Sequence, residues 1–230
     1  HAAILCSPHN PCGRVWERWE LEKAMELYKK YDVYVISDEI WSDIILSGHK
    51  HTPTQSVSED ARMRTAAFYA PSKTFNLAGL VGSYHIVYND WWRDRILKES
   101  SLNHYNMMNV LSMHALMGAY KPEGYEWTDE LCEVLTGNID FACDYIANHF
   151  EGVKVAKPEG TYMLFVDCTD WCAAHGKTIE DVEQACWDVG VAIQDGRMFH
   201  GPCHLRMNLA SPRSRIEEAF RRMDQYVFNA

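Results

Sequence analysis

The sequence lacks the features of several common classes of protein. No apolar run approaches the ~20 residues of a transmembrane helix, and the first residues show neither the charged nor the apolar region of a signal peptide. Acidic residues outnumber basic ones: the sequence has 32 Asp and Glu and 22 Lys and Arg, which gives a formal net charge of −10. Nucleic acids and anionic membranes favour clustered positive charge. We therefore expect a cytoplasmic protein whose partner is a small molecule, with no nucleic acid and no membrane.

The spacing typical of zinc sites is also missing. Eight cysteines are present, but none forms a repeated CxxC pair, and the nearest two, Cys168 and Cys172, are four residues apart. A chain of 230 residues can bury a core without disulfide bonds. We expect reduced, mostly buried thiols and no metal site.

Short apolar runs alternate with amphipathic stretches up to about residue 120. Strands are expected at 3–6, 33–36, 66–69 and 84–88, and helices over 17–31, 90–98 and 101–119. This alternation predicts an α/β fold with a largely parallel sheet.

The remaining sequence has a different pattern. Helices are expected over 127–150, 178–189 and 214–228, and strands near 161–167 and 204–209. This order predicts a smaller α+β domain over 123–230, after a first domain over 1–122, with the boundary near Pro122 and Gly124. Because the chain opens directly on a predicted strand, we also expect it to be truncated.

Polar residues follow three of the predicted strands, where ligands gather in α/β sheets. Asn10 lies in SPHNPCG, a sequence that an ordinary Asn-Pro turn explains well. Asp38 and Glu39 lie in SDEIW, where paired carboxylates suit a helix cap or a metal as well as catalysis. Lys73 lies in APSKTFNLAG, an apolar turn that favours an uncharged amine able to attack a carbonyl. A lysine that extends its charged end into solvent is the alternative.

Taken together and in order, these turns resemble those of a known superfamily. The strings CSPHNPCGRVW, ISDEIWSDI, APSKTFNLAGL, GVAIQDGRMF and HLRMNLASPRSRIEEAFRRM are similar to motifs of fold-type I pyridoxal-phosphate enzymes. The closest likeness is to the MalY/PatB and cystalysin group of cystathionine β-lyase-like C–S lyases. The resemblance covers nearly the whole chain. It implies an incomplete large domain of the aspartate aminotransferase type, a small C-terminal domain, pyridoxal 5′-phosphate as cofactor, an amino-acid substrate and a homodimer.

The resemblance also implies roles for individual residues. Lys73 would form the Schiff base with the cofactor and later take the α-proton of the substrate. Asp38 would pair with the pyridine nitrogen, and Asn10 would hydrogen-bond the phenolic oxygen. Ser72 would contact the phosphate. Arg206 would hold the substrate α-carboxylate, although an ordinary surface ion pair is the alternative for this arginine.

The sequence departs from the family pattern at two positions and lacks one segment. Trp41, which by the resemblance would contact the cofactor, stands where relatives place Tyr or His. An indole can stack and donate one hydrogen bond but is no acid or base near neutral pH. Val81 stands where aminotransferases carry a phosphate-binding arginine, which favours a lyase. The N-terminal segment that supplies an aromatic ring, a phosphate-binding helix start and much of the dimer interface is not in the sequence.

Three functions remain open. The leading hypothesis is β-elimination from cystathionine or a cysteine-like amino acid, which gives a thiol, pyruvate and ammonia. An aminotransferase on the same fold is the second. A non-catalytic regulatory or binding protein, or a truncated homologue, is the third.

Overall fold

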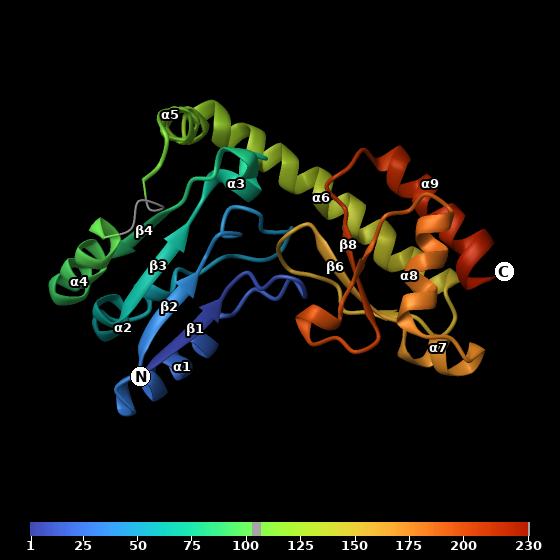
Figure 1. Cartoon of the computed structure of the whole chain (residues 1–230), viewed down its shortest axis with the longest axis horizontal. Coiled ribbons are helices and arrows are strands. Elements are labelled where there is room, and N and C mark those ends of the chain that lie inside the picture. The colour runs from blue at the N-terminus through green and yellow to red at the C-terminus, as the bar shows by residue number, and fades with distance from the viewer. Residues whose placement is uncertain (103–106, 230) are drawn as a thin grey trace. The chain divides into compact units, whose positions relative to one another are not determined.

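The computed structural model describes residues 1–102 and 107–229 (Figure 1). It divides into two compact units, one of His1–His9 with Arg14–Glu130 and one of Asn10–Gly13 with Leu131–Ala230. Each unit is described by itself below. The domain boundary expected at residue 122 stays a prediction.

The first unit contains a four-stranded sheet. Its strands are β1 (Ala2–Cys6), β2 (Tyr34–Asp38), β3 (Thr65–Tyr69) and β4 (Tyr84–Val87), in that order across the sheet. The first three strands are parallel, and β4 runs antiparallel to β3. A largely parallel sheet is thus confirmed. A parallel strand needs a crossover connection, whereas the chain between β3 and β4 turns back through α3 (Pro71–Thr74) and η2 (Ala78–Leu80).

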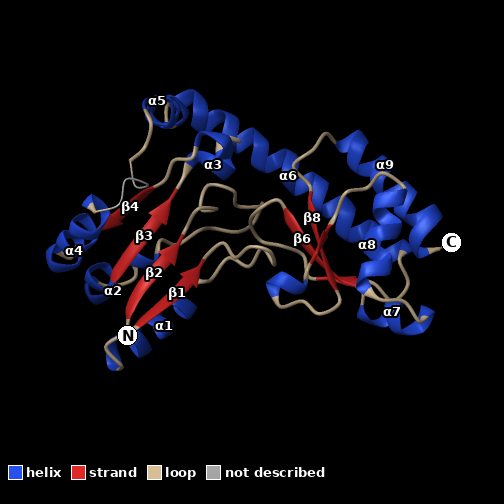
Figure 2. Cartoon of the chain, in the orientation of Figure 1, coloured by secondary structure: helices blue, strands red, loops and turns tan. Residues whose placement is uncertain are grey.

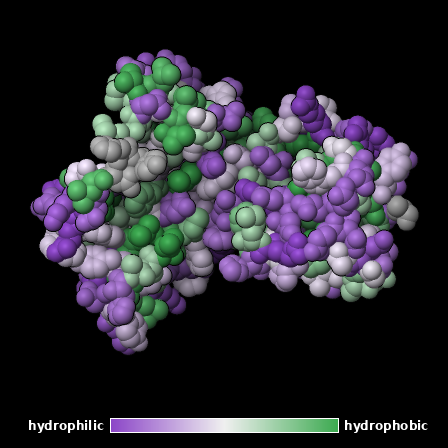
Figure 3. Space-filling model, viewed as in Figure 1, coloured by the Kyte–Doolittle hydropathy of each residue, from purple (hydrophilic) through white to green (hydrophobic). Residues whose placement is uncertain are grey.

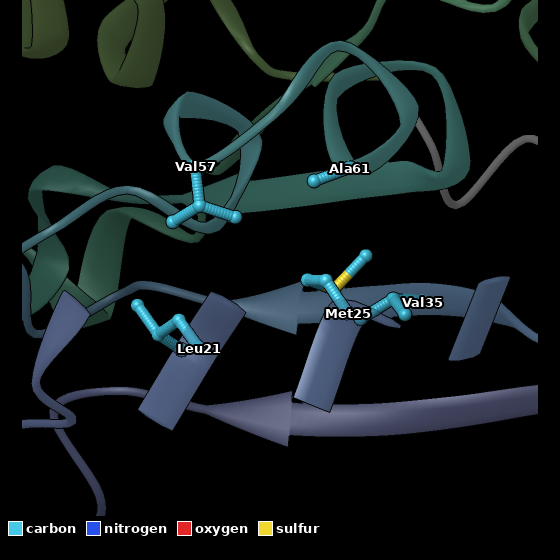
Figure 4. Close-up of a cluster of buried hydrophobic side chains, with 5 residues drawn as sticks. All are labelled: Leu21, Met25, Val35, Val57 and Ala61. Carbon is cyan, nitrogen blue, oxygen red and sulfur yellow. The ribbon is translucent and has the colours of Figure 1, made fainter. Parts of the chain in front are cut away.

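A crossover helix covers one face of this sheet. The helix α1 (Arg18–Lys30) begins at a capping box in which Glu17 and Glu20 exchange hydrogen bonds with the backbone, and its last turn is basic. Leu21 and Met25, one turn apart, face the core. They join Val35 of β2, Val57 and Ala61 in the buried cluster of Figure 4. Ala61 lies on α2 (Glu59–Arg64), which precedes β3.

Two further helices follow β4. These are α4 (Asp90–Ser101) and α5 (Val110–Ala119). The helix expected over 101–119 is wrong at residues 107–109, where the structure has no helix, and residues 103–106 lie outside the described residues. Asn109 explains the late start, because its side chain accepts a hydrogen bond from Ser112 N and caps α5 there. The long helix α6 (Pro122–His149) comes next, and it begins five residues before the expected start at 127.

The second unit is built on an antiparallel sheet. Its strands β5 (Lys154–Val155), β6 (Met163–Asp167), β7 (Gln194–Asp195) and β8 (His204–Asn208) lie in the order β5-β6-β8-β7. The helices α7 (Thr169–His175), α8 (Ile179–Asp188) and α9 (Arg213–Met223) connect and follow the strands, and a short π-helix η5 (Asp224–Phe228) continues α9 (Figure 2). The two-residue strands β5 and β7 are too short to produce a sequence periodicity.

Aromatic rings fill the core of the second unit. Phe220 of α9 is 1% exposed. Its ring lies parallel to that of Phe150 at 6.0 Å, and it meets the rings of Phe141 and Tyr145 edge-on at 5.7 and 5.5 Å. These rings join α6 to α9 within the unit.

The surface and the thiols match the sequence only in part. None of the eight cysteines forms a disulfide, but only Cys168, Cys172 and Cys186 are buried, so the expectation of mostly buried thiols is wrong. None of the described helices is long and apolar enough to cross a membrane.

On the face seen in Figure 3, hydrophobic side chains gather over the first unit, whereas hydrophilic ones dominate the second.

Truncating Phe220 should destabilise the second unit. We expect Phe220→Ala to lower the free energy of unfolding by about 3–5 kcal/mol, because it leaves a cavity among three rings. Val134→Ala, at an exposed position of α6, should change it by at most about 0.5 kcal/mol. Urea unfolding of both variants measures the difference, and equal effects would contradict the assignment of this core.

Candidate functional site

The carboxyl ends of β2 and β3 form the candidate site of the first unit. Asp38, the last residue of β2, pairs in register with Phe68 of β3. Parallel strands end at the same edge of a sheet, so Asp38 and the turn that follows Tyr69 begin side by side. The register therefore brings the carboxylate and the lysine-bearing turn to one edge.

Lys73 projects from a single helical turn. Pro71 occupies the first position of α3, which suits its fixed φ and missing N–H, and Phe75 N closes the turn on Pro71 O at 2.9 Å. Lys73 is half-buried, and its Nζ lies 5.7 Å from the ring centroid of Trp41. Trp41 is itself buried. A cation over an indole face is attracted to the ring, so Trp41 confines the amine.

Asp38 and Ser72 supply polar side chains at the edge of the sheet where β2 and β3 end. Ile40 N donates to Asp38 Oδ1 at 3.2 Å, and Oδ2 has no hydrogen-bond partner among the described residues. Both Asp38 and Ser72 are half-buried. A carboxylate oxygen without a protein partner suits a nearby positive group such as a protonated ring nitrogen.

Asn10 lies in the second unit, in the short segment 10–13. Glu159 N and Gly160 N both donate to Gly13 O, at 2.9 and 3.0 Å, and so hold the segment. Gly13 has φ +70°, and a Cβ there would lie 2.2 Å from Pro158 Cβ, so only glycine fits. The Asn10 Oδ1 atom is buried and has no hydrogen-bond partner among the described residues. A buried amide oxygen in this state suits a polar ligand.

Arg206 projects from β8 in the same unit. Its Nη1 donates to Gln194 Oε1 at 2.6 Å, and its Cζ lies 5.0 Å from the ring centroid of Phe199. Its Nε is buried and has no hydrogen-bond partner within the described parts of the chain, and burial lowers the pKa of the guanidinium. No carboxylate of the described residues forms an ion pair with Arg206, unlike the surface alternative. A half-buried arginine that lacks an anion suits a bound carboxylate.

Glu39 has a different environment from its neighbour Asp38. Its side chain is 0% exposed. Oε1 accepts hydrogen bonds from Ser37 Oγ at 2.9 Å and Thr54 N at 3.0 Å. Tyr69 OH donates to Oε2 at 2.8 Å, and His51 Nε2 lies 2.9 Å from the same oxygen. Sequence reasoning grouped the two acids and missed this network, because His51 and Tyr69 are distant in the chain.

The network also shifts two pKa values. Burial alone raises the pKa of the Glu39 carboxyl. The hydrogen bond and the electrostatic interaction with His51, together with the hydrogen bonds from Thr54 and Tyr69, lower the pKa by more than burial raises it, so the net shift is downward. Burial first, and the Glu39 carboxylate second, raise the pKa of the Tyr69 hydroxyl. Glu39 is therefore ionised, and Tyr69 is a neutral donor to it.

A second carboxylate holds the other side of the Lys73 turn. Thr74 Oγ1 donates to Asp43 Oδ2 at 2.9 Å, and Tyr120 OH lies 3.4 Å from the same oxygen. Thr74 is buried. Asp43 and Thr74 carry no sequence signal of this pairing, since 31 residues separate them.

Comparisons with known proteins match most of the chain. A family model described as aminotransferase class I and II matches residues 2–223. Cystathionine β-lyase PatB of Bacillus subtilis (strain 168) is 34% identical over 223 residues, which are 96% of this chain and 56% of PatB. The chain thus spans little more than half the length of this relative.

Solved structures match equally well. Cystalysin from Treponema denticola, which contains a pyridoxal 5′-phosphate cofactor, has a TM-score of 0.90 and 33% identity, covering 97% of this chain and 56% of cystalysin. A PLP-bound protein from Clostridium difficile 630, provisionally named an aminotransferase, has a TM-score of 0.87 and 40% identity. That match covers 97% of this chain and 57% of the other.

Replacing Glu39 should make the free energy of unfolding depend less on pH in the acidic range. The folded-state pKa lies below the usual value of 4.5, so ionisation stabilises the fold above about pH 4.5 and this stabilisation is lost as the pH falls through the folded pKa. We expect Glu39→Gln to lower the free energy of unfolding by about 1–3 kcal/mol at about pH 7, because an amide cannot accept from all four donors.

The difference between wild type and Glu39→Gln should narrow as the pH falls from about 5 to about 3. Urea unfolding across this range measures it. Glu22→Gln, which removes an exposed pair with Arg18, is the control and should cost at most about 0.5 kcal/mol. A difference that stays constant with pH would refute the assignment.

Proposed function

The chain belongs to the aminotransferase class I and II family, and on that premise we propose that it forms the cofactor-holding part of a pyridoxal 5′-phosphate-dependent carbon–sulfur lyase. The predicted family and fold class are confirmed by these matches. The observation that carries the proposal is the Lys73 amine held against Trp41, with an uncommitted oxygen of Asp38 at the end of the neighbouring strand.

The residues present fit the cofactor. Asn10 Oδ1 is a buried polar atom without a protein partner, and Asp38 Oδ2 has no partner among the described residues. When bound, pyridoxal 5′-phosphate supplies an electron sink for negative charge at the α-carbon of an amino acid. Lys73 would bind its carbonyl carbon, Asp38 its ring nitrogen, Asn10 its phenolic oxygen and Ser72 its phosphate.

The protein side chains then move and position protons. Arg206 would bind the substrate carboxylate through Nε and an Nη group, which orients the α-hydrogen. Lys73 would take that α-proton as the general base. The bond from the β-carbon to sulfur would then break, and the sulfur would leave as a thiol with the proton that Lys73 had taken. Water would hydrolyse the three-carbon remainder to pyruvate and ammonia.

Elimination is favoured over amino transfer for two reasons. Val81 is exposed and apolar, so it offers no positive charge to a phosphate at the position where aminotransferases place an arginine. The named relatives PatB and cystalysin also support the proposal of a lyase acting on cystathionine or a similar amino acid. The aminotransferase stays the second candidate, supported by the Clostridium difficile structure.

We extend the proposal to assembly and location. A homodimer is supported by apolar side chains that α5 leaves exposed, namely Val110, Leu111, Met113 and Met117. A cytoplasmic location is supported by the absence of disulfides among eight cysteines.

Lys73→Ala should abolish covalent cofactor binding. Wild type mixed with pyridoxal 5′-phosphate should absorb visible light, and borohydride should attach the cofactor to the peptide that contains Lys73. The Lys73→Ala protein should show neither signal, whereas Lys98→Ala, which removes a lysine of α4, should show both. A colourless wild type with no trapped label would refute the proposed enzyme.

The products distinguish the two enzymatic candidates. Thiol and pyruvate released from cystathionine without an oxo acid support the lyase. Amino transfer that requires an oxo acid, with no thiol release, supports the aminotransferase instead.

Arg206→Lys should weaken substrate binding more than it slows turnover. An ammonium cannot form the two parallel hydrogen bonds of a guanidinium with a carboxylate, so we expect KM to rise about tenfold to a hundredfold with little change in kcat. Arg197→Lys is the control, because Arg197 is already paired with Asp195. An unchanged KM for Arg206→Lys would exclude Arg206 as the carboxylate-binding residue.

A further inference from the structure

Two carboxylates that follow β2 contact residues on either side of Lys73. Glu39 accepts a hydrogen bond from Tyr69, four residues before Lys73, and Asp43 accepts one from Thr74, the residue after it. We propose that Glu39 and Asp43 are positioning residues that anchor both ends of the Lys73 turn to the segment that carries Asp38. This inference rests on the proposed function, because it concerns the cofactor that Lys73 and Asp38 would hold.

Glu39 is buried, and its carboxylate is fully hydrogen-bonded. A carboxylate has about four sites at which it accepts hydrogen bonds, and partners from Ser37, Thr54, His51 and Tyr69 occupy four. A buried ionised group is costly unless it is fully hydrogen-bonded. Movement of the Tyr69 hydroxyl away from Oε2 would therefore destabilise the folded state, because it leaves the buried carboxylate short of one hydrogen bond.

Glu39 also joins three separate stretches of chain. Ser37 belongs to β2, Thr54 begins η1 (Thr54–Ser56), His51 lies in the loop before η1, and Tyr69 ends β3. Glu39 N donates to Phe68 O at 3.0 Å, which continues the backbone pairing past the end of β2. The side chain and the backbone of Glu39 thus both tie β2 to the strand that leads to Lys73.

Aromatic contacts stiffen both anchors. The rings of Tyr69 and Tyr84 stack at 5.4 Å, and Tyr84 meets Tyr120 edge-on at 6.2 Å. Tyr120 in turn meets Phe75, which closes α3, at 5.4 Å. Hydroxyl groups and rings therefore hold the Lys73 turn from both sides, within the first unit.

The consequence concerns the distance between Lys73 and Asp38. A group that binds one end of a cofactor and a group that binds the ring nitrogen must keep a fixed spacing, and reacting atoms misplaced by about 1 Å cost roughly a hundredfold in rate. Neither Glu39 nor Asp43 needs to touch the cofactor to set that spacing. Both act through Tyr69 and Thr74.

Two hydroxyl groups on opposite oxygens of Glu39 provide a matched test. Tyr69→Phe removes the donor to Oε2 on the side of Lys73, and Ser37→Ala removes the donor to Oε1 on the far side. We expect both to lower the urea midpoint of the cofactor-free protein. Only Tyr69→Phe should weaken the affinity for pyridoxal 5′-phosphate, by about fivefold or more, and reduce the visible circular dichroism that reports an asymmetrically held cofactor.

Thr74→Val tests the second anchor in the same way. It keeps the shape of the side chain but removes the hydroxyl bound to Asp43, and it should weaken affinity and visible circular dichroism as Tyr69→Phe does. If the Tyr69→Phe protein does not fold, Thr74→Val still decides whether the turn needs its anchors. Trapping by borohydride at Lys73 confirms that each variant retains the lysine chemistry.

The outcomes separate this inference from the proposed function. The positioning role is overturned if Tyr69→Phe and Thr74→Val both keep the wild-type affinity and circular dichroism. It is also overturned if Ser37→Ala loses as much cofactor affinity as Tyr69→Phe. In either case a visible band in the wild type still supports the proposed cofactor. A wild type without a visible band overturns the proposed function and this inference with it.

Discussion

Parallel pairing between β1, β2 and β3 is the constraint on which the candidate site of the first unit depends. Asp38 pairs with Cys6 on one side and with Phe68 on the other. Because the strands run the same way, they end at one edge, and each following turn leaves the sheet there. A register slip by one residue would reverse the faces to which the β2 side chains point.

The alternation of side chains explains how two adjacent acids come to differ. Successive residues at the end of a strand point in opposite directions, so Asp38 remains half-buried while Glu39 enters the core. Four donors surround Glu39, whereas one oxygen of Asp38 has no partner among the described residues. The same dipeptide thus provides one partly exposed carboxylate at the edge of the sheet and one buried, fully hydrogen-bonded carboxylate.

Local patterns predicted the parts of the fold that depend on local forces. The strands near 3–6 and 66–69 and the helix near 17–31 follow from apolar periodicity and capping, and the strand-end turns identified Lys73 and Asp38 as candidates. The break at Asn109 and the two-residue strands β5 and β7 were missed, since a cap or a strand pair depends on few residues.

Contacts between distant residues could not be predicted in this way. His51 is 12 residues from Glu39, and Tyr69 is 30. Their partnership depends on which strands become neighbours and in what register, which no short window of sequence contains. The same holds for the unpartnered Nε of Arg206, because burial without an anion is a property of the folded second unit.

The position of Lys73 is important because its neighbour Trp41 cannot act as an acid or a base. Trp41 lies under the Lys73 amine, and an indole donates a single hydrogen bond but does not exchange a proton near neutral pH. If Asp38 binds the positively charged ring nitrogen of the cofactor, its carboxylate is not available for proton transfer to the substrate. In the proposed reaction, proton transfer at the substrate would then depend on Lys73, whose position is set by the short helical turn α3. In the proposed enzyme, anchoring that turn through Glu39 and Asp43 would fix the base relative to the cofactor without adding another ionisable group at the reacting carbon.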